Sequence, residues 1–197
     1  MGNNNYIFLI LIASIGLFVV GLIYGIEKSK DNAIETTYGI DLSGGQYVRL
    51  VFIGSSTCFY ANNTETIYMV SNIKNKLKTV LEKDVIKFIS TGISYDRSTT
   101  IAINYLKKTG PYDELLVGAG AFNLGIINYV SGSSSTPKVL IFHELYETDL
   151  SGLNINNLHS SQSLLKTYTG QFEIRNLYES IKYKSRDDLL MYFGINK

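Results

Sequence analysis

The sequence predicts an α/β domain that follows one N-terminal transmembrane helix. Two observations support this fold class. Residues 6–26 form a run of 21 residues without a charged side chain, and beyond them short segments rich in Val, Ile and Leu alternate with amphipathic segments of helical period. We therefore divide the chain into a membrane anchor (residues 1–26), a polar linker (27–38) and one folded domain (39–197).

The apolar run 6–26 is long enough to cross a bilayer, since its 21 residues, at a rise of 1.5 Å each, span the hydrocarbon core of about 30 Å. It has no polar face, which argues against a helix in a globular core. A cleavable signal peptide begins with basic residues and has a shorter apolar stretch, whereas this chain begins MGNNN. Lys28 and Lys30 favour a cytoplasmic domain by the positive-inside rule, but Glu27 and Asp31 beside them weaken that preference.

The charged residues are nearly balanced, with 18 basic and 17 acidic side chains, so nucleic-acid binding is not predicted. The chain has one cysteine, which excludes an intramolecular disulfide and a cysteine-based zinc site. Glu144, Glu147 and Asp149 lack the regular spacing of a calcium loop, and we interpret them as a solvated turn. His143 and His159 are interpreted as surface or satisfied histidines. Neither a metal nor a cofactor is expected.

Hydrophobic periodicity predicts the order of strands and helices. Residues 47–53 are mostly apolar, as in a strand buried on both faces of a sheet, and residues 64–83 carry apolar side chains at three- and four-residue intervals, as in an amphipathic helix. The other expected elements are strands at 85–94, 115–117, 137–142 and 168–177 and helices at 98–108, 122–130 and 186–193, the last capped by Gly194.

Cys58 is the main candidate for chemistry. It follows the buried strand 47–53 and a turn of small residues, and it precedes the long helix 64–83. The positive end of a helix dipole and free backbone N–H groups stabilise a thiolate, so this position suits a nucleophile. The alternative is that Cys58 is a small buried hydrophobic residue without reactivity.

The order of elements resembles the thioredoxin-like superfamily, especially its membrane-tethered thioredoxins of extracytoplasmic thiol metabolism and their peroxiredoxin-like relatives. Residues 39–52 look like the lead-in to their central strand, and residues 56–61 fall where they carry Trp-Cys-x-x-Cys. The other matching segments are 86–96, which ends at an aspartate as theirs does, 106–110 and 135–142. The resemblance implies a thioredoxin-like domain with a central mixed sheet flanked by helices.

By this resemblance Thr136 and Pro137 are the substrate-binding residues. In the family a cis-proline packs against the active-site cysteine and leaves the backbone of the preceding residue free to pair with a substrate peptide. A cis X-Pro bond is uncommon. The alternative is an ordinary trans Pro137 that opens an edge strand.

The active-site motif is degenerate, because residues 58–61 read Cys-Phe-Tyr-Ala. Ala61 replaces the second cysteine, so an internal two-cysteine cycle is impossible, and Thr57 replaces the tryptophan. A mixed disulfide between Cys58 and a partner protein or small thiol remains feasible, with an external thiol to resolve it. Arg49 is a further departure, since no acidic partner for it is evident in the sequence.

Three functions remain open on the sequence. They are a membrane-anchored, single-cysteine thiol-disulfide oxidoreductase, a redox-inactive thioredoxin-like interaction or chaperone module, and a peroxidase. The peroxidase is least favoured, because its motif has Pro seven residues and Thr three residues before the cysteine, where this chain has Val51 and Ser55. Ser55 and Thr57 are expected to support the site. From the resemblance we expect a single-pass protein of the cell membrane whose domain lies outside the cytoplasm.

Overall fold

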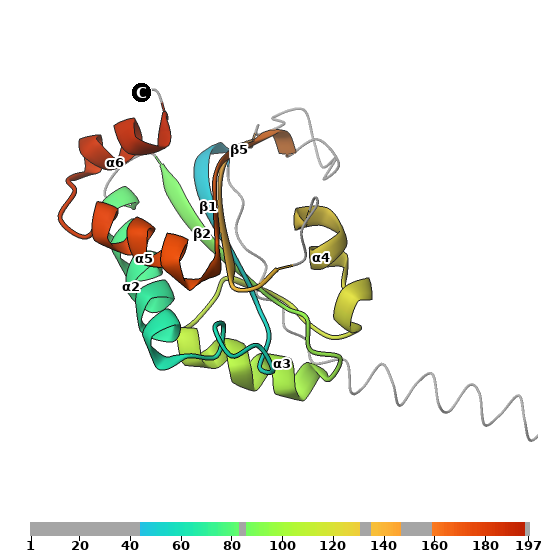
Figure 1. The fold of residues 1–197 in the computed structure, drawn as a ribbon. Coiled ribbons are helices and arrows are strands. Elements are labelled where there is room, and N and C mark those ends of the chain that lie inside the picture. Colours follow the sequence, from blue (N-terminus) through green and yellow to red (C-terminus); the bar gives the residue numbers. More distant parts are fainter. Residues whose placement is uncertain (1–43, 83–85, 131–134, 147–158, 196–197) are drawn as a thin grey trace, which may run out of the picture. The chain divides into compact units, whose positions relative to one another are not determined.

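A five-stranded mixed sheet lies at the centre of the structure (Figure 1). The computed structural model describes residues 44–82, 86–130, 135–146 and 159–195. The strand order is β3-β2-β1-β4-β5, with β1 parallel to β2 and antiparallel to β4. The strands are β1 (Gly45–Gly54), β2 (Lys87–Ser94), β3 (Glu114–Leu116), β4 (Lys138–Tyr146) and β5 (His159–Thr169).

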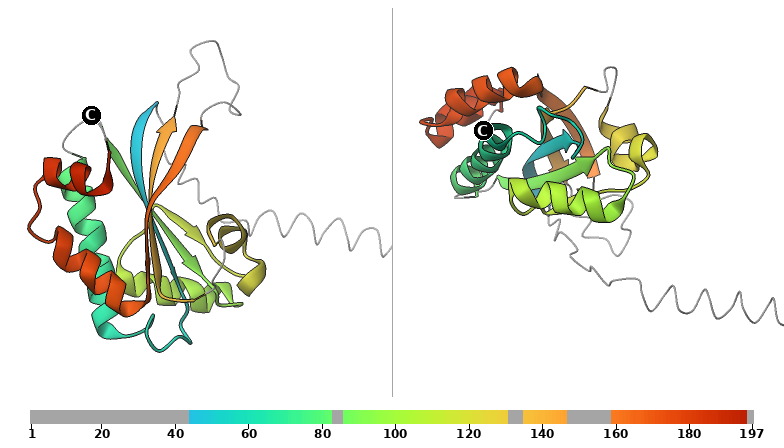
Figure 2. Two further views of the ribbon diagram at one scale, coloured as in Figure 1. Left: turned by 45° about the horizontal axis from the view of Figure 1, so that its top comes forward. Right: turned by 60° about the horizontal axis from the view of Figure 1, so that its bottom comes forward.

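Helices cover both faces of this sheet, as Figure 2 shows. On one face lie α2 (Thr64–Leu81), α5 (Gly170–Ile181) and α6 (Arg186–Phe193), and on the other lies the short α4 (Leu124–Tyr129). The remaining helical elements are α3 (Thr99–Leu106) and the 3₁₀ turns η1 (Lys107–Thr109) and η2 (Gly120–Phe122). The predicted central sheet flanked by helices is confirmed.

The predicted anchor 6–26 and linker 27–38 lie outside the described residues, as do Glu147 and Asp149. Within the part of the chain that the structure describes, no helix is both long and apolar enough to cross a bilayer.

Strand β1 is buried on both faces. Val48, Leu50 and Phe52 belong to the apolar cluster shared with α2, α5 and α6, whereas Val51 and Ile53 pack in a second cluster with α4. Each fully buried side chain of this size contributes about 1.5–3 kcal/mol to folding. The prediction that residues 47–53 form a strand buried on both faces is confirmed. The end of β1 sets the position at which the loop with Cys58 begins.

The expectation that Arg49 has no acidic partner is wrong. Its guanidinium, in the middle of β1, donates to Glu144 of β4 over 2.8 Å and also to Glu114 of β3. Tyr146 and Gln162 donate to the same Glu144 carboxylate over 2.9 and 2.6 Å. Glu144 is 1% exposed, so its interpretation as part of a solvated turn is also wrong. The two partners are 95 residues apart in sequence, and only strand pairing brings them together.

The strand predicted at residues 168–177 is a helix over most of its length. Strand β5 ends at Thr169, Gly170 adopts a φ of +81°, and α5 begins there. Ile174 is buried while Phe172 is 69% exposed, as on an amphipathic helix. By contrast, the predicted terminal helix is confirmed as α6 and ends at Gly194 with a φ of +71°.

Lys74 of α2 is a buried lysine, only 4% exposed. Its ammonium donates to the Pro111 carbonyl over 2.7 Å and lies 3.3 Å from the centre of the Tyr112 ring. Burial lowers the pKa of Lys74 to about 7, although the negative charge of Asp113 opposes that shift. The folded protein therefore binds fewer protons than the unfolded chain from about pH 7 up to the ordinary lysine pKa of about 10.4.

This difference makes the free energy of unfolding rise with pH over that range, by at most about 1.4 kcal/mol per pH unit for one proton. Lys74→Met removes the titrating group and should flatten the rise, as urea unfolding at several pH values would measure. Lys78→Met on the exposed side of α2 is the control and should keep the slope. An unchanged slope in Lys74→Met would contradict the assignment.

Candidate functional site

The loop from Ser55 to Asn62 connects β1 to α2 and carries Cys58. Two hydrogen bonds shape it: the Cys58 N–H donates to the Ser55 carbonyl over 3.2 Å, and the Asn62 N–H donates to the Cys58 carbonyl over 2.9 Å. Helix α2 begins only at Thr64, where the Asn63 side chain caps it. Cys58 therefore lies within the loop and not in the first turn of the helix.

The Cys58 thiol lies beside the loop that leads into β4. The side chain is partly buried, and Sγ donates a hydrogen bond to the Thr136 carbonyl oxygen over 3.4 Å. The Thr136–Pro137 peptide bond is cis. The structure thus brings Cys58, Thr136 and Pro137 together and confirms both the predicted cis bond and its closeness to the cysteine.

The predicted stabilisation of a thiolate by backbone amides is not seen. Within the described residues, no N–H group donates a hydrogen bond to Cys58 Sγ, and the thiol itself is the donor in its bond to Thr136. In this structure the Thr136 carbonyl therefore holds the thiol by its proton.

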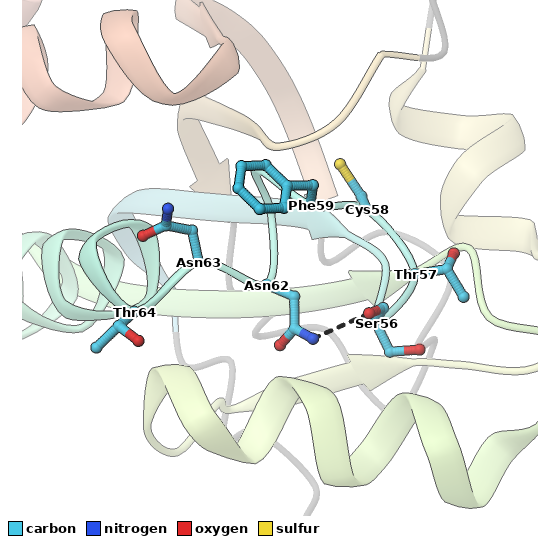
Figure 3. Close-up of a pocket in the computed structure, with 7 residues that line it drawn as sticks. All are labelled: Ser56, Thr57, Cys58, Phe59, Asn62, Asn63 and Thr64. Carbon is cyan, nitrogen blue, oxygen red and sulfur yellow. Dashed lines mark hydrogen bonds between the residues drawn. The ribbon is translucent and has the colours of Figure 1, made fainter.

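An open hollow of about 300 Å³ lies along this loop (Figure 3). In the close-up, the sulfur of Cys58 and the ring of Phe59 lie on the opposite side of the loop from Ser56 and Asn62. The hollow is lined by Ser56, Thr57, Cys58, Phe59, Asn62, Asn63 and Thr64. Hydroxyl and amide groups form most of this lining.

Exposed aromatic rings border the cysteine. Phe59 is 77% exposed and Tyr60 is 58% exposed, and their rings meet edge to face with centroids 5.4 Å apart. A second hollow of about 330 Å³ is lined by Tyr60 together with Phe172 and neighbouring residues at the start of α5. The Gly170 N–H donates to the Pro137 carbonyl over 2.7 Å, so the start of α5 adjoins the cis-proline. The sequence did not indicate this aromatic surface, because its parts are more than 100 residues apart.

Ser55 and Thr57 were expected to support the site, and the structure gives them different positions. Ser55 is 7% exposed, and its hydroxyl donates to Asp96 over 3.1 Å and lies 2.9 Å from the Thr57 hydroxyl. Thr57 is exposed and lines the hollow. Asp96 was identified from the sequence only as the residue after the second strand, and its contacts with this loop were missed.

Tyr105 of α3 holds the far end of the loop. Its buried hydroxyl donates to the Ala61 carbonyl over 3.0 Å. Burial raises the pKa of Tyr105 above its ordinary range, so the hydroxyl stays a donor. A side chain at Gly54 would place its Cβ 2.1 Å from this hydroxyl, which explains why glycine ends β1. Ala61, at the position of the missing second cysteine, is fully buried.

Other candidate groups contribute nothing to the site. His143 lies on β4, half-buried, with its Cα paired to Val48 rather than near Cys58. Among the described residues, no group of three or more His, Cys, Asp and Glu side chains could hold a metal ion.

The topology and the site together identify the fold. A central strand leads into a cysteine-bearing loop and a helix, a parallel strand pairs on one side of it, and an antiparallel strand entered through a cis-proline pairs on the other. The domain is thioredoxin-like. In this thioredoxin-like domain the Thr136 carbonyl, next to the cis bond to Pro137, accepts a hydrogen bond from Cys58 Sγ, which places the cis-proline close to the cysteine as the sequence resemblance implied.

Comparison with solved structures finds proteins of this kind at low sequence identity. A thiol:disulfide interchange protein from a Bacteroides species is 12% identical, with a TM-score of 0.36 over 72% of this chain and 76% of that chain. A thioredoxin-family thiol:disulfide interchange protein from Chlorobium tepidum TLS is 12% identical, with a TM-score of 0.32 over 71% and 81%. Copper-bound ScoI from Bradyrhizobium japonicum is 15% identical, with a TM-score of 0.33 over 71% and 87%. No protein-family model and no curated protein matches the sequence.

Proposed function

We propose that this chain is a membrane-tethered thioredoxin-like protein that exchanges disulfides through Cys58 alone. One observation carries the proposal: the only thiol of the chain lies partly exposed in the β1–α2 loop, with Sγ 3.4 Å from the Thr136 carbonyl. The side chain packs against the edge of the main apolar cluster but stays partly exposed, whereas an inert core cysteine would be fully enclosed by apolar side chains.

The exchange needs no second cysteine in the chain. After losing its proton, Cys58 Sγ attacks one sulfur of a partner disulfide, and the other partner sulfur leaves as a thiolate and takes up a proton. The product is a mixed disulfide between Cys58 and the partner. An external thiol then attacks the partner sulfur of this bond, which releases Cys58 as a thiol and leaves a disulfide between the partner and the external thiol. A second external thiol resolves that disulfide, so that two electrons pass from two external thiols, which end joined as a disulfide, to the partner.

The surface around Cys58 favours a polypeptide partner over a small thiol. Phe59, Tyr60 and Phe172 are all more than half exposed and adjoin the cysteine loop and the cis-proline. Aromatic rings at a contact surface supply large apolar area at low cost in conformational entropy. A small thiol would leave most of that area in water.

The membrane tether rests on residues 6–26, whose 21 uncharged positions suit one transmembrane span. The full chain should stay in membranes after alkaline extraction, whereas a chain lacking residues 6–26 should not. A phosphatase that is active only outside the cytoplasm, fused to the C-terminus, should be active. Extraction of the full chain would contradict the tether, and an inactive fusion would contradict the extracytoplasmic placement.

A second candidate is a redox-inactive interaction module. Its support is the hydrogen bond from the thiol to Thr136 together with buried Ala61 in place of a resolving cysteine. The peroxidase has no comparable support, since the Ser55 hydroxyl bonds to Asp96 and Thr57.

Trapping of mixed disulfides separates the two candidates. Full-length protein incubated with a peptide disulfide that carries aromatic residues should form a covalent adduct sensitive to reductant, because no internal thiol can resolve it. Cys58→Ser should form none, and mass spectrometry of the intact chain measures both. Absence of an adduct from the folded wild-type protein would favour the interaction module.

Ala61→Cys provides a matched gain-of-function variant. A thiol three residues after Cys58 should attack the mixed disulfide and form an internal bond, provided that the two side chains meet disulfide geometry. The adduct should then disappear, and a second equivalent of peptide thiol should be released in addition to the one set free when the adduct forms. Persistence of the adduct would show that this loop cannot close a disulfide.

A further inference from the structure

Asp96, just beyond β2, collects hydrogen bonds from the start of the cysteine loop. Its Oδ1 accepts from the Ser56 hydroxyl over 2.8 Å and from the Ser55 hydroxyl over 3.1 Å. Its Oδ2 accepts from the Ser56 backbone N–H over 3.0 Å and from the Ser94 hydroxyl over 2.7 Å. The residue is 8% exposed. Four donors therefore converge on one buried carboxylate, and three of them belong to the loop.

This carboxylate is held ionised. Burial by itself raises the pKa of Asp96, but the hydrogen bonds from Ser56, Ser94 and Ser55 outweigh burial and lower it below the ordinary value. An ionised carboxylate offers about four lone-pair sites, and four donors fill them here. Hydrogen bonds to a charged acceptor are about twice as strong as those between neutral groups.

The path from Asp96 to the cysteine is short. Asp96 fixes Ser55 and Ser56, and the Ser55 carbonyl accepts from the Cys58 N–H over 3.2 Å. The side-chain amide of Asn62 donates a hydrogen bond to the Ser56 carbonyl over 3.0 Å. The turn that carries Cys58 is therefore tied to the end of β2. Thr136, which accepts the hydrogen bond from the Cys58 thiol, belongs instead to the loop before β4.

We propose that Asp96 is a positioning residue for Cys58: through Ser55 and Ser56 it sets the place of the cysteine turn and so directs the thiol to the Thr136 carbonyl. This inference concerns the site of the proposed disulfide exchange, and for its catalytic meaning it rests on that function. The geometry itself can be tested whether or not the thiol is reactive.

Asn is the informative substitution for Asp96. An amide of the same size keeps one acceptor oxygen, replaces the other by an NH₂ donor and carries no charge, so that the charge-assisted hydrogen bonds of the carboxylate are lost. The hold of residue 96 on the turn is then weakened without a change in side-chain volume. Asp113→Asn is the matched control, because Asp113 also accepts from a serine N–H and hydroxyl, those of Ser90 over 2.7 and 2.8 Å, but away from the cysteine loop.

The S–H stretching band in Raman spectra of the full chain is a direct readout, because only one cysteine contributes to it. In Asp96→Asn the band should shift toward that of a free thiol, and exchange with the peptide disulfide should slow by at least about tenfold, as expected when a reacting group is misplaced. Asp113→Asn should keep both the band and the rate, even where it lowers stability.

A wild-type band and a wild-type exchange rate in folded Asp96→Asn would overturn the positioning role. A shifted band would support the positioning role even if neither the wild type nor any variant exchanged disulfides. Such a lack of exchange would overturn only the proposed function. Ser55→Ala, which removes a single hydroxyl donor, serves if Asp96→Asn does not fold. It should shift the band in the same direction, and an unchanged band would overturn the proposal.

Discussion

The pairing of β1 between β2 and β4 is the constraint on which the rest of the structure depends. The Arg49 side chain lies on the α4 side of the sheet. There its guanidinium donates hydrogen bonds to Glu144, Glu114 and Tyr146. A slip of β1 by one residue would turn the guanidinium into the apolar cluster beneath α2. An unpaired charge there would cost several kcal/mol. The ion pair therefore contributes to the choice of register, and the register sets where the cysteine loop starts.

The cysteine loop is held from two sides. At one end, Asp96, which follows β2, accepts a hydrogen bond from the Ser56 N–H. At the other end, Tyr105 of α3 donates to the Ala61 carbonyl. Across the loop, Thr136 accepts from the thiol. These contacts leave Phe59 and Tyr60 projecting into solvent. The fixed base and the exposed aromatic rim of this loop are the features on which the proposed peptide recognition rests.

Sequence reasoning recovered the elements whose burial is periodic. Strand β1 and helices α2 and α6 follow apolar patterns, and the cis-proline beside Cys58 followed from family resemblance. Strand β5 was missed at its beginning because His159 to Ser163 are polar residues of an edge strand, where no apolar alternation is required. The partners of Arg49 and the contacts of Asp96 could not be predicted, since tertiary pairing alone brings them together.

The contrast between Ala61 and Cys58 summarises what is specific to this chain. Ala61 is buried and fills the core below the loop, whereas Cys58, three positions earlier, keeps its sulfur partly exposed beside a hollow. Loss of the second thiol removes internal resolution but not the first exchange step. The remaining chemistry depends on whether the thiol can leave its hydrogen bond to Thr136 and react.

The rate of Cys58 alkylation in the folded full-length chain tests this most directly. It would be measured with iodoacetamide near neutral pH and compared with the rate for the same chain in denaturant. We expect the folded protein to be alkylated without prior unfolding, because the Cys58 sulfur is partly exposed beside a hollow. Alkylation that occurs only after unfolding would contradict it and would make Cys58 a packing residue.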